Sequence, residues 1–448
     1  MVHSEFLSLP DDALLVVLAF LAPRELFACR TVCRRLRDIC EHRDLWRKVH
    51  VWDDDAGLLR AVLALAPCLK GMHLSSPLAA LDLASLVPGS TCVVDGLSFH
   101  LATENDVVLA IDVLLHLSSV GGVRELYIEW GGEPPVKTLT KLAEAICSLP
   151  GLLYFDFHYP FEEPLQVTLR NLDVEVMPTL KRLEFIGDRM DPFAELLLKK
   201  HADTLQEVRV YHRDVPVSLL MVLPRLRSLA CLSHKDLAQL SNLENLDSFE
   251  LLYDLEEVPK EKDVFCPGTL KFLRRASHLK NVTLPLYSPA NLLALSLSFS
   301  SVLVETLDLK CFPGFYFEGL IDVLHQFPSL RTLSVDAEPS DDFLRTISPV
   351  SLPRLATLVV YPPMNPSIRA WLHEPAIQDL LIRNPDLHLF FHNRRGRGVY
   401  ACLCVWCCRC RGRRSSEADC SKQPVSSHKR KAGCNCFQVA VSPSQPTD

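Results

Sequence analysis

Apolar and polar positions repeat in a six-residue pattern along most of the chain. The pattern is an apolar residue, two variable ones, an apolar residue, a variable one and an apolar one. It occurs thirteen times, with starts 20 to 33 residues apart, as LKGMHL (69–74), VDGLSF (94–99), VRELYI (123–128), LLYFDF (152–157), LKRLEF (180–185), LQEVRV (205–210), LRSLAC (226–231), LDSFEL (246–251), LKNVTL (279–284), VETLDL (304–309), LRTLSV (330–335), LATLVV (355–360) and IQDLLI (377–382). Its last four positions alternate as in a strand, so each occurrence predicts a short strand.

A leucine-rich phrase with helical spacing precedes many of these predicted strands, as in LTKLAEAICSLPG (139–151). Leu-Pro or Phe-Pro pairs end such phrases, because the residue before proline avoids the α region. The repeating unit is therefore helix, turn and short strand. It resembles the leucine-rich-repeat family, which implies an α/β solenoid with parallel strands on the concave face and helices on the convex face. We expect about 13 repeats over residues 52–392.

A second pattern stands at the start of the chain, where residues 13–22 carry no polar side chain. A helix of that length measures roughly 15 Å, about half of a bilayer's hydrocarbon core. A helix that is apolar all round must be covered on every side. Pro10 and two aspartates predict the helix start, and two further short helices are expected over residues 26–29 and 32–40.

Residues 1–51 resemble the F-box family. The resemblance rests on Leu9, Pro10, Asp12, Leu18, Leu21, Leu26, the run Val32-Cys33-Arg34-Arg35, and Leu45-Trp46. It implies docking on a Skp-type adaptor, which connects the chain to a cullin and a RING protein. By this resemblance, the expected adaptor-binding residues are Leu9, Pro10, Leu14, Leu18, Leu21 and Leu26. Val32, Ile39 and Trp46 are expected to pack the helices together.

The residue between the last two apolar positions of each repeat, and the residue after them, should face the concave surface. In the middle repeats these residues are Tyr127, Glu129, Asp156, His158, Glu184, Arg209 and Tyr211. Tyrosine and arginine dominate many protein interfaces, which makes this surface a candidate for binding a protein substrate. An ordinary solvated surface is the alternative for any one of them.

Composition and the first residues predict the class of protein and its cellular compartment. The 448 residues are 48% hydrophobic and 23% charged, as in a globular protein, and the net charge is −7. The first residues, MVHSEF, lack the basic region of a secretory signal, so we expect a cytoplasmic or nuclear protein with free thiols. An uncharged stretch at 282–304 is long enough to span a membrane, but its two prolines and its serines favour a packed interior.

A basic, cysteine-rich tail is expected over residues 393–448 and should be disordered. Between Arg394 and Cys436 eleven Lys/Arg oppose two acidic residues, giving +9 there and −16 elsewhere. The acidic body argues against a DNA-binding domain, and we expect no nucleic-acid partner, although the basic tail could attract nucleic acid or anionic lipid. Zinc binding or palmitoylation beside a polybasic patch are both open for Cys402, Cys404, Cys407, Cys408 and Cys410, the second implying membrane contact, and so is a tail with neither role.

No catalytic motif stands out: the chain has no GxxxxGK[ST], HExxH or GxSxG. We expect a non-catalytic protein without a cofactor. The resemblance implies the substrate-recognition subunit of an SCF-type ubiquitin ligase, which acts by proximity. The alternative is a repeat scaffold that binds the adaptor without delivering a substrate and is held at a membrane by its tail.

Overall fold

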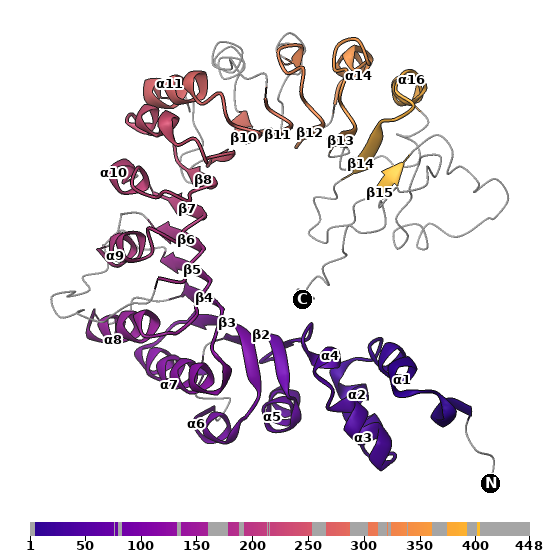
Figure 1. Cartoon of the computed structure of the whole chain (residues 1–448), viewed down its shortest axis with the longest axis vertical. Helices are drawn as coiled ribbons and strands as arrows, with labels where there is room; N and C mark the ends of the chain where they lie inside the picture. The colour runs from indigo at the N-terminus through magenta and orange to yellow at the C-terminus, as the bar shows by residue number, and fades with distance from the viewer. Residues whose placement is uncertain are drawn as a thin grey trace. The chain divides into compact units, whose positions relative to one another are not determined.

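The structure is a computed structural model. It describes residues 5–75, 77–78, 83–131, 136–159, 178–187, 192–212, 214, 216–252, 266–286, 303–311, 320, 324–337, 339–360, 374–391 and 401–403. The chain divides into two compact units, Met1–Leu226 and Arg227–Asp448. Each unit contains seven consecutive parallel strands with helices on one side of them (Figure 1).

The first unit begins with short helices. They are the 3-10 helix η1 and the α-helices α1 to α4, with bounds Glu5–Ser8, Asp11–Leu18, Pro23–Arg30, Arg34–Cys40 and Arg43–Trp46. Pro10 has extended backbone and places Asp11 and Asp12 in the first turn of α1, where the helix dipole favours negative charge. Pro23 occupies the first turn of α2, which needs no N–H there. The three predicted helices are present, and α4 follows them.

The repeats of the first unit alternate strands with helices. The strands β1 to β7 are His50–Trp52, Cys68–Ser75, Val93–Leu101, Glu125–Trp130, Tyr154–Tyr159, Arg182–Gly187 and Glu207–Tyr211. The helices are α5 Ala56–Leu65, α6 Leu83–Leu86, η3 Val87–Gly89, α7 Glu104–Gly121, α8 Val136–Cys147, α9 Pro192–Lys200 and α10 Val217–Leu220. The helices α7, α8 and α9 lie on the same side of the strands (Figure 1). The opposite side of β1–β7 is called the open face below.

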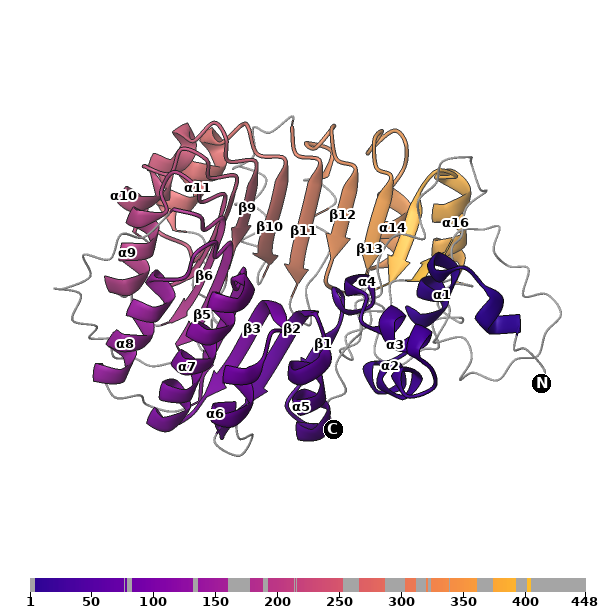
Figure 2. The ribbon, with the colours of Figure 1, turned by 60° about the horizontal axis from the view of Figure 1, so that its bottom comes forward.

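The second unit continues this alternation. Its strands β8 to β14 are Ser228–Cys231, Ser248–Leu251, Asn281–Leu286, Thr306–Cys311, Thr332–Val335, Thr357–Val360 and His388–Phe391, and β15 (Ala401–Leu403) pairs antiparallel with β14. The described helices are η5 Leu237–Asn242, α11 Pro267–Arg275, α14 Asp341–Thr346 and α16 Pro375–Arg383. The strands β9 to β13 stand side by side in Figure 2.

Twelve of the thirteen six-residue patterns overlap a strand, from β2 to β13, as predicted. The thirteenth, IQDLLI, is wrong: it forms α16, whose buried residues Ile377, Leu380 and Leu381 follow a helical spacing. Pro375 in the first turn starts that helix. The strand of this repeat, β14, comes after Asn384-Pro385, and β1 is an additional strand before the first pattern.

Neighbouring repeats are joined in the same way along both units. The second residue of a pattern presents its carbonyl to two successive N–H groups of the next repeat. The Lys181 carbonyl, for example, accepts from Gln206 and Glu207 at 2.8 and 3.0 Å, and the Glu305 carbonyl accepts from Arg331 and Thr332 at 2.8 and 2.9 Å. This ladder satisfies backbone N–H and C=O groups where these strands begin.

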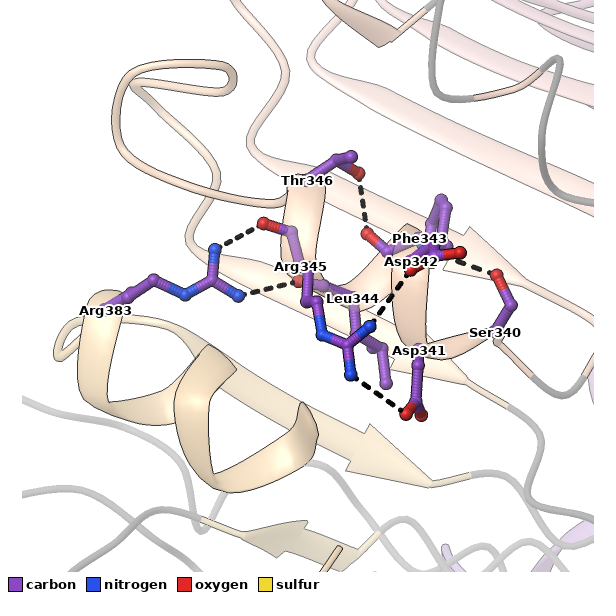
Figure 3. A network of polar contacts seen from close by, with 8 residues as sticks. All are labelled: Ser340, Asp341, Asp342, Phe343, Leu344, Arg345, Thr346 and Arg383. Atoms are coloured by element: carbon purple, nitrogen blue, oxygen red, sulfur yellow. Dashed lines mark hydrogen bonds and ion pairs between the residues drawn. The ribbon is translucent and has the colours of Figure 1, made fainter. Parts of the chain in front are cut away.

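Helices of the second unit are also tied to one another by side chains (Figure 3). The Arg383 guanidinium on α16 donates to the carbonyls of Leu344, Arg345 and Ile347 at the end of α14. Asn384 donates from Nδ2 to the Ile347 carbonyl at 3.1 Å. These donors satisfy carbonyls that a helix C-terminus leaves without intrahelical partners.

No helix in the described ranges is long and apolar enough to cross a membrane. Within the uncharged stretch 282–304, residues 282–286 belong to β10, and residues 287–302 lie outside the described part of the chain. The cysteine-rich tail beyond Leu403, with Cys404, Cys407, Cys408 and Cys410, also lies outside it, and of Cys402 only the backbone in β15 is described.

Candidate functional site

Helix α1 and the turn after it bury some of their apolar side chains and expose others. Leu14 and Leu18, one turn apart, are 0% and 2% exposed, whereas Val16, Val17 and Phe20 are 64%, 43% and 87% exposed. The sequence therefore folds half of this apolar stretch into the core of its own helices. The other half, Val16, Val17 and Phe20, is named the apolar patch.

The predicted adaptor-binding set divides accordingly. Leu14, Leu18 and Leu26 lie in the core, so the prediction that they face a second protein is wrong for these three. The cause is helical periodicity, which puts residues i and i+4 on the same side, here against the neighbouring helices. Leu9 and Leu21 are half-buried and Pro10 is exposed, so these three remain accessible.

One arginine holds the segment that precedes α1. Arg35 on α3 donates from Nη2 to the Leu9 carbonyl at 2.6 Å, and its Nε and Nη2 donate to Asp11 Oδ1 at 3.0 and 2.6 Å. The Leu7 carbonyl accepts from Nη1 at 2.5 Å. A planar guanidinium with donors fixed in one plane can satisfy all these acceptors together. Arg35 thereby fixes the position of Leu9 and Pro10 beside α1.

The packing residues are placed as follows. Ile39 is 7% exposed and Trp46 is 0% exposed, and the Trp46 indole donates to the Cys40 carbonyl at 2.7 Å. Val32 is 67% exposed, so its predicted packing role is wrong. The reason is that α3 begins two residues later, at Arg34, and its inward position is taken by Leu36.

The N-terminal helices are joined closely to the first repeat. Only residues 47–49 separate α4 from β1. Arg30 on α2 pairs with Glu41 at 2.8 Å and donates to the Leu65 carbonyl, at the end of α5, at 3.2 Å. Arg24 pairs with Asp55, the residue that caps α5. The apolar patch and the open face therefore belong to one compact unit.

The open face carries the seven predicted substrate-binding residues in two adjacent rows. Tyr127, Asp156, Glu184 and Arg209 are successive register partners across β4 to β7. Glu129 is the partner of His158 in the next row, and Tyr211 is the partner of Ile186. All seven are half-buried or exposed, while the alternating residues between them are buried.

Charged pairs cross this face. The Lys70 ammonium bridges Asp95 and Glu125 at 2.7 and 2.9 Å. Arg209 Nε is 2.9 Å from Glu184, and Arg182 Nε is 2.7 Å from Glu207. These partly exposed pairs order the side chains more than they stabilise the fold.

Two groups on this face were absent from the predicted set. A third row holds Glu125, Tyr154 and Arg182, because the first residue of each strand also points to this side. At the edge, the rings of Trp52 and His73 stack 5.1 Å apart, and His50 Nδ1 lies 3.2 Å from His73 Nε2. The alternation in HVW (50–52) is the signal that could have shown β1.

The described ranges also contain buried thiols and the residue types that bind metal ions. Within the described ranges, no group of three or more His, Cys, Asp or Glu residues is placed to hold a metal ion. Burial raises the pKa of the Cys92 thiol to about 12 and that of the Cys147 thiol to about 11, which keeps both thiols protonated.

The chain is similar in part to known proteins. Residues 6–52 match the family model described as F-box-like. Among solved structures, the chain is similar to one from the Rad7 and Elc1 complex in yeast, with 15% identity, 78% of this chain and 88% of that chain covered, and a TM-score of 0.41. It is also similar to one from the TLR13–ssRNA13 complex, with 14% identity, 74% and 37% covered, and a TM-score of 0.27. No curated protein matches the chain.

Proposed function

Since the chain carries an F-box-like domain over residues 6–52 and leucine-rich repeats after it, we propose that it is the substrate-binding subunit of an SCF-type ubiquitin ligase. The F-box-like helices bind a Skp-type adaptor, and through it a cullin and a RING protein. The repeats bind a protein substrate. The chain itself is non-catalytic and acts in the cytoplasm or nucleus by bringing substrate and ubiquitin-carrying enzyme together.

The observation that carries the proposal is the apolar patch. Val16, on α1, is 64% exposed, and Phe20, in the turn that follows α1, is 87% exposed. Contiguous exposed apolar side chains, here on a helix and the turn after it, mark a surface that another protein covers. Leu9 and Pro10, held beside α1 by Arg35, extend this surface.

The close junction between α4 and β1 supports the receptor role. A ligase subunit that works by proximity gains from a fixed distance between its adaptor surface and its substrate surface. Here the helices pack against α5 and β2 through Arg30, Arg24 and a hydrogen bond from the Cys68 thiol to the Arg43 carbonyl at 3.7 Å.

The test is a pull-down of a Skp-type adaptor with the full chain. We expect Val17→Ser/Phe20→Ser to abolish adaptor capture, because it makes the centre of the patch polar without touching the core. The control is Val108→Ser/Leu115→Ser, which changes two apolar side chains on α7 that are 44% and 45% exposed. Undiminished capture by the patch variant, or equal loss in the control, would contradict the proposal. Adaptor capture without any captured substrate would favour the scaffold alternative.

A further inference from the structure

The open face of the first unit has an excess of negative charge. At the strand positions that point to this face, β4 to β7 carry five carboxylates and two guanidinium groups. Lys70 of β2 and Asp95 of β3 add one cation and one carboxylate, which pair with each other and cancel in the net charge. Five minus two leaves a net charge of −3 with neutral histidines. The carboxylates are Glu125, Glu129, Asp156, Glu184 and Glu207, and the guanidinium groups belong to Arg182 and Arg209.

Asp156 lies in the middle of this face and forms no ion pair among the described residues, although the charge of Arg209 partly opposes the rise in the pKa of Asp156. The two arginines are engaged by Glu207 and Glu184, and Lys70 is engaged by Glu125. Among the residues that the structure describes, no Lys, Arg or His nitrogen lies within 4 Å of the Asp156 carboxylate. From the described part of the chain it accepts one hydrogen bond, from the Tyr154 hydroxyl at 3.3 Å, and that hydroxyl is also 3.3 Å from Glu184.

One hydroxyl proton therefore serves two carboxylates. A hydroxyl donates a single hydrogen bond, and Glu184 also pairs with Arg209, so Asp156 shares its one donor with a carboxylate that already has a cation. Burial and the neighbouring Glu184 raise the pKa of Asp156 to about 6. A partner that brings a cation to this point removes the repulsion between the two acids and adds a charge-assisted hydrogen bond.

Aromatic rings stand next to Asp156. Tyr127 is its register partner on β4 and meets Tyr154 edge-on, with ring centroids 4.9 Å apart. The Arg182 guanidinium already lies over the Tyr154 ring, 4.6 Å from its centroid. The face thus binds one cation of its own chain by the combination of ring and carboxylate that a second cation would find at Tyr127 and Asp156.

We infer that this face binds an extended protein segment rich in arginine or lysine, with one cationic side chain seated on Asp156 beside Tyr127. The inference rests on the proposed function and names the chemical class of its substrate. Charge complementarity favours a basic segment, because the same five carboxylates would repel an acidic one. The rows of outward residues across β4 to β7 give such a segment successive contacts on neighbouring strands.

The test uses the full chain and two fluorescent peptides, one of alternating Gly and Arg and one of alternating Gly and Glu. We expect the Arg peptide to bind and the Glu peptide to fail, and Asp156→Asn to weaken binding of the Arg peptide by about tenfold. The matched control is Asp112→Asn, which removes the same charge from an exposed position on α7. It should change the affinity by less than about twofold, because exposed distant charges are screened.

Three results would overturn the inference. Equal weakening in Asp112→Asn would show attraction to the acidic body as a whole, and equal binding of both peptides would show no charge selection. The Arg peptide could also bind only after Arg409, Arg411, Arg413 and Arg414 are changed to Ser. That result would show that the chain's own basic tail, and not a substrate, occupies the site at Asp156. Thermal unfolding of Asp156→Asn at or above the wild-type temperature shows that the variant is folded.

Failure here is separable from failure of the proposed function. Asp156→Asn leaves the apolar patch intact, so adaptor capture should be unchanged in this variant. Peptide discrimination without adaptor capture would refute the ligase role and keep the binding face. Adaptor capture without peptide discrimination would refute the binding face alone.

Discussion

Truncation to alanine should lower the free energy of unfolding strongly at Leu18 and hardly at all at Phe20, although both residues belong to the same apolar stretch. Leu18 is 2% exposed and packs inside the N-terminal helices, so Leu18→Ala leaves a cavity. Such cavities cost about 2–5 kcal/mol of unfolding free energy. Phe20 is 87% exposed, and Phe20→Ala should change the free energy of unfolding by less than about 0.5 kcal/mol.

Amide hydrogen exchange of peptides from α1 to α4 measures this locally, which suits a chain of two units whose unfolding need not be a single step. A loss of about 2–5 kcal/mol corresponds to faster exchange by a factor of about 30 to several thousand. Unchanged protection in Leu18→Ala would refute the assignment of Leu18 to the core. Protection lost equally in Phe20→Ala would refute the assignment of Phe20 to the surface.

Three further changes test other parts of the structure. Because the pKa of Asp156 is raised from 3.8 to about 6, the folded chain keeps a proton that the unfolded chain releases between these values, and stability should fall as pH rises through this window. Asp156→Asn should flatten that dependence in denaturant titrations at pH 4.5 and 7. Gly268→Ala would press a Cβ against the Lys235 carbonyl and should lower the Tm, whereas Gly89→Ala points into open space and should not. Arg383→Ala should destabilise the last turn of α14 by about 1 kcal/mol, seen as faster amide exchange there, and Arg383→Lys should restore only part of the protection because lysine lacks the planar fork.

The strands were largely predictable from the sequence because each has one buried face. Alternating burial with period two leaves a direct trace in the order of apolar residues, as in β6, where Leu183 and Phe185 are buried and Glu184 is not. The failure at IQDLLI has a physical origin. Ile377, Leu380 and Ile382 fit the six-residue pattern, while Ile377, Leu380 and Leu381 fit a helical spacing of three and four, and there the proline at position 375 decides for the helix.

The faces of the N-terminal helices were less predictable. A stretch in which every residue is apolar carries no periodicity, so the sequence could not distinguish Leu14 and Leu18, which are buried, from Val16 and Phe20, which are exposed. The Arg35 contacts to backbone carbonyls at Leu7 and Leu9 were also beyond a sequence pattern, because they join residues 26 and 28 positions apart. On the open face, alternation placed Asp156 correctly but could not show that its neighbours' cations are engaged elsewhere.

The central claim is that the chain delivers a bound protein to a ubiquitin ligase. The most direct measurement is ubiquitination of a captured protein in a reconstituted reaction with adaptor, cullin, RING protein and ubiquitin-carrying enzyme, comparing the wild-type chain with Val17→Ser/Phe20→Ser. We predict ubiquitin chains on the captured protein with the wild-type chain and none with the variant, although the variant still binds that protein through its repeats. Equal ubiquitination with both chains, or none with the wild type in the presence of adaptor, would contradict the account.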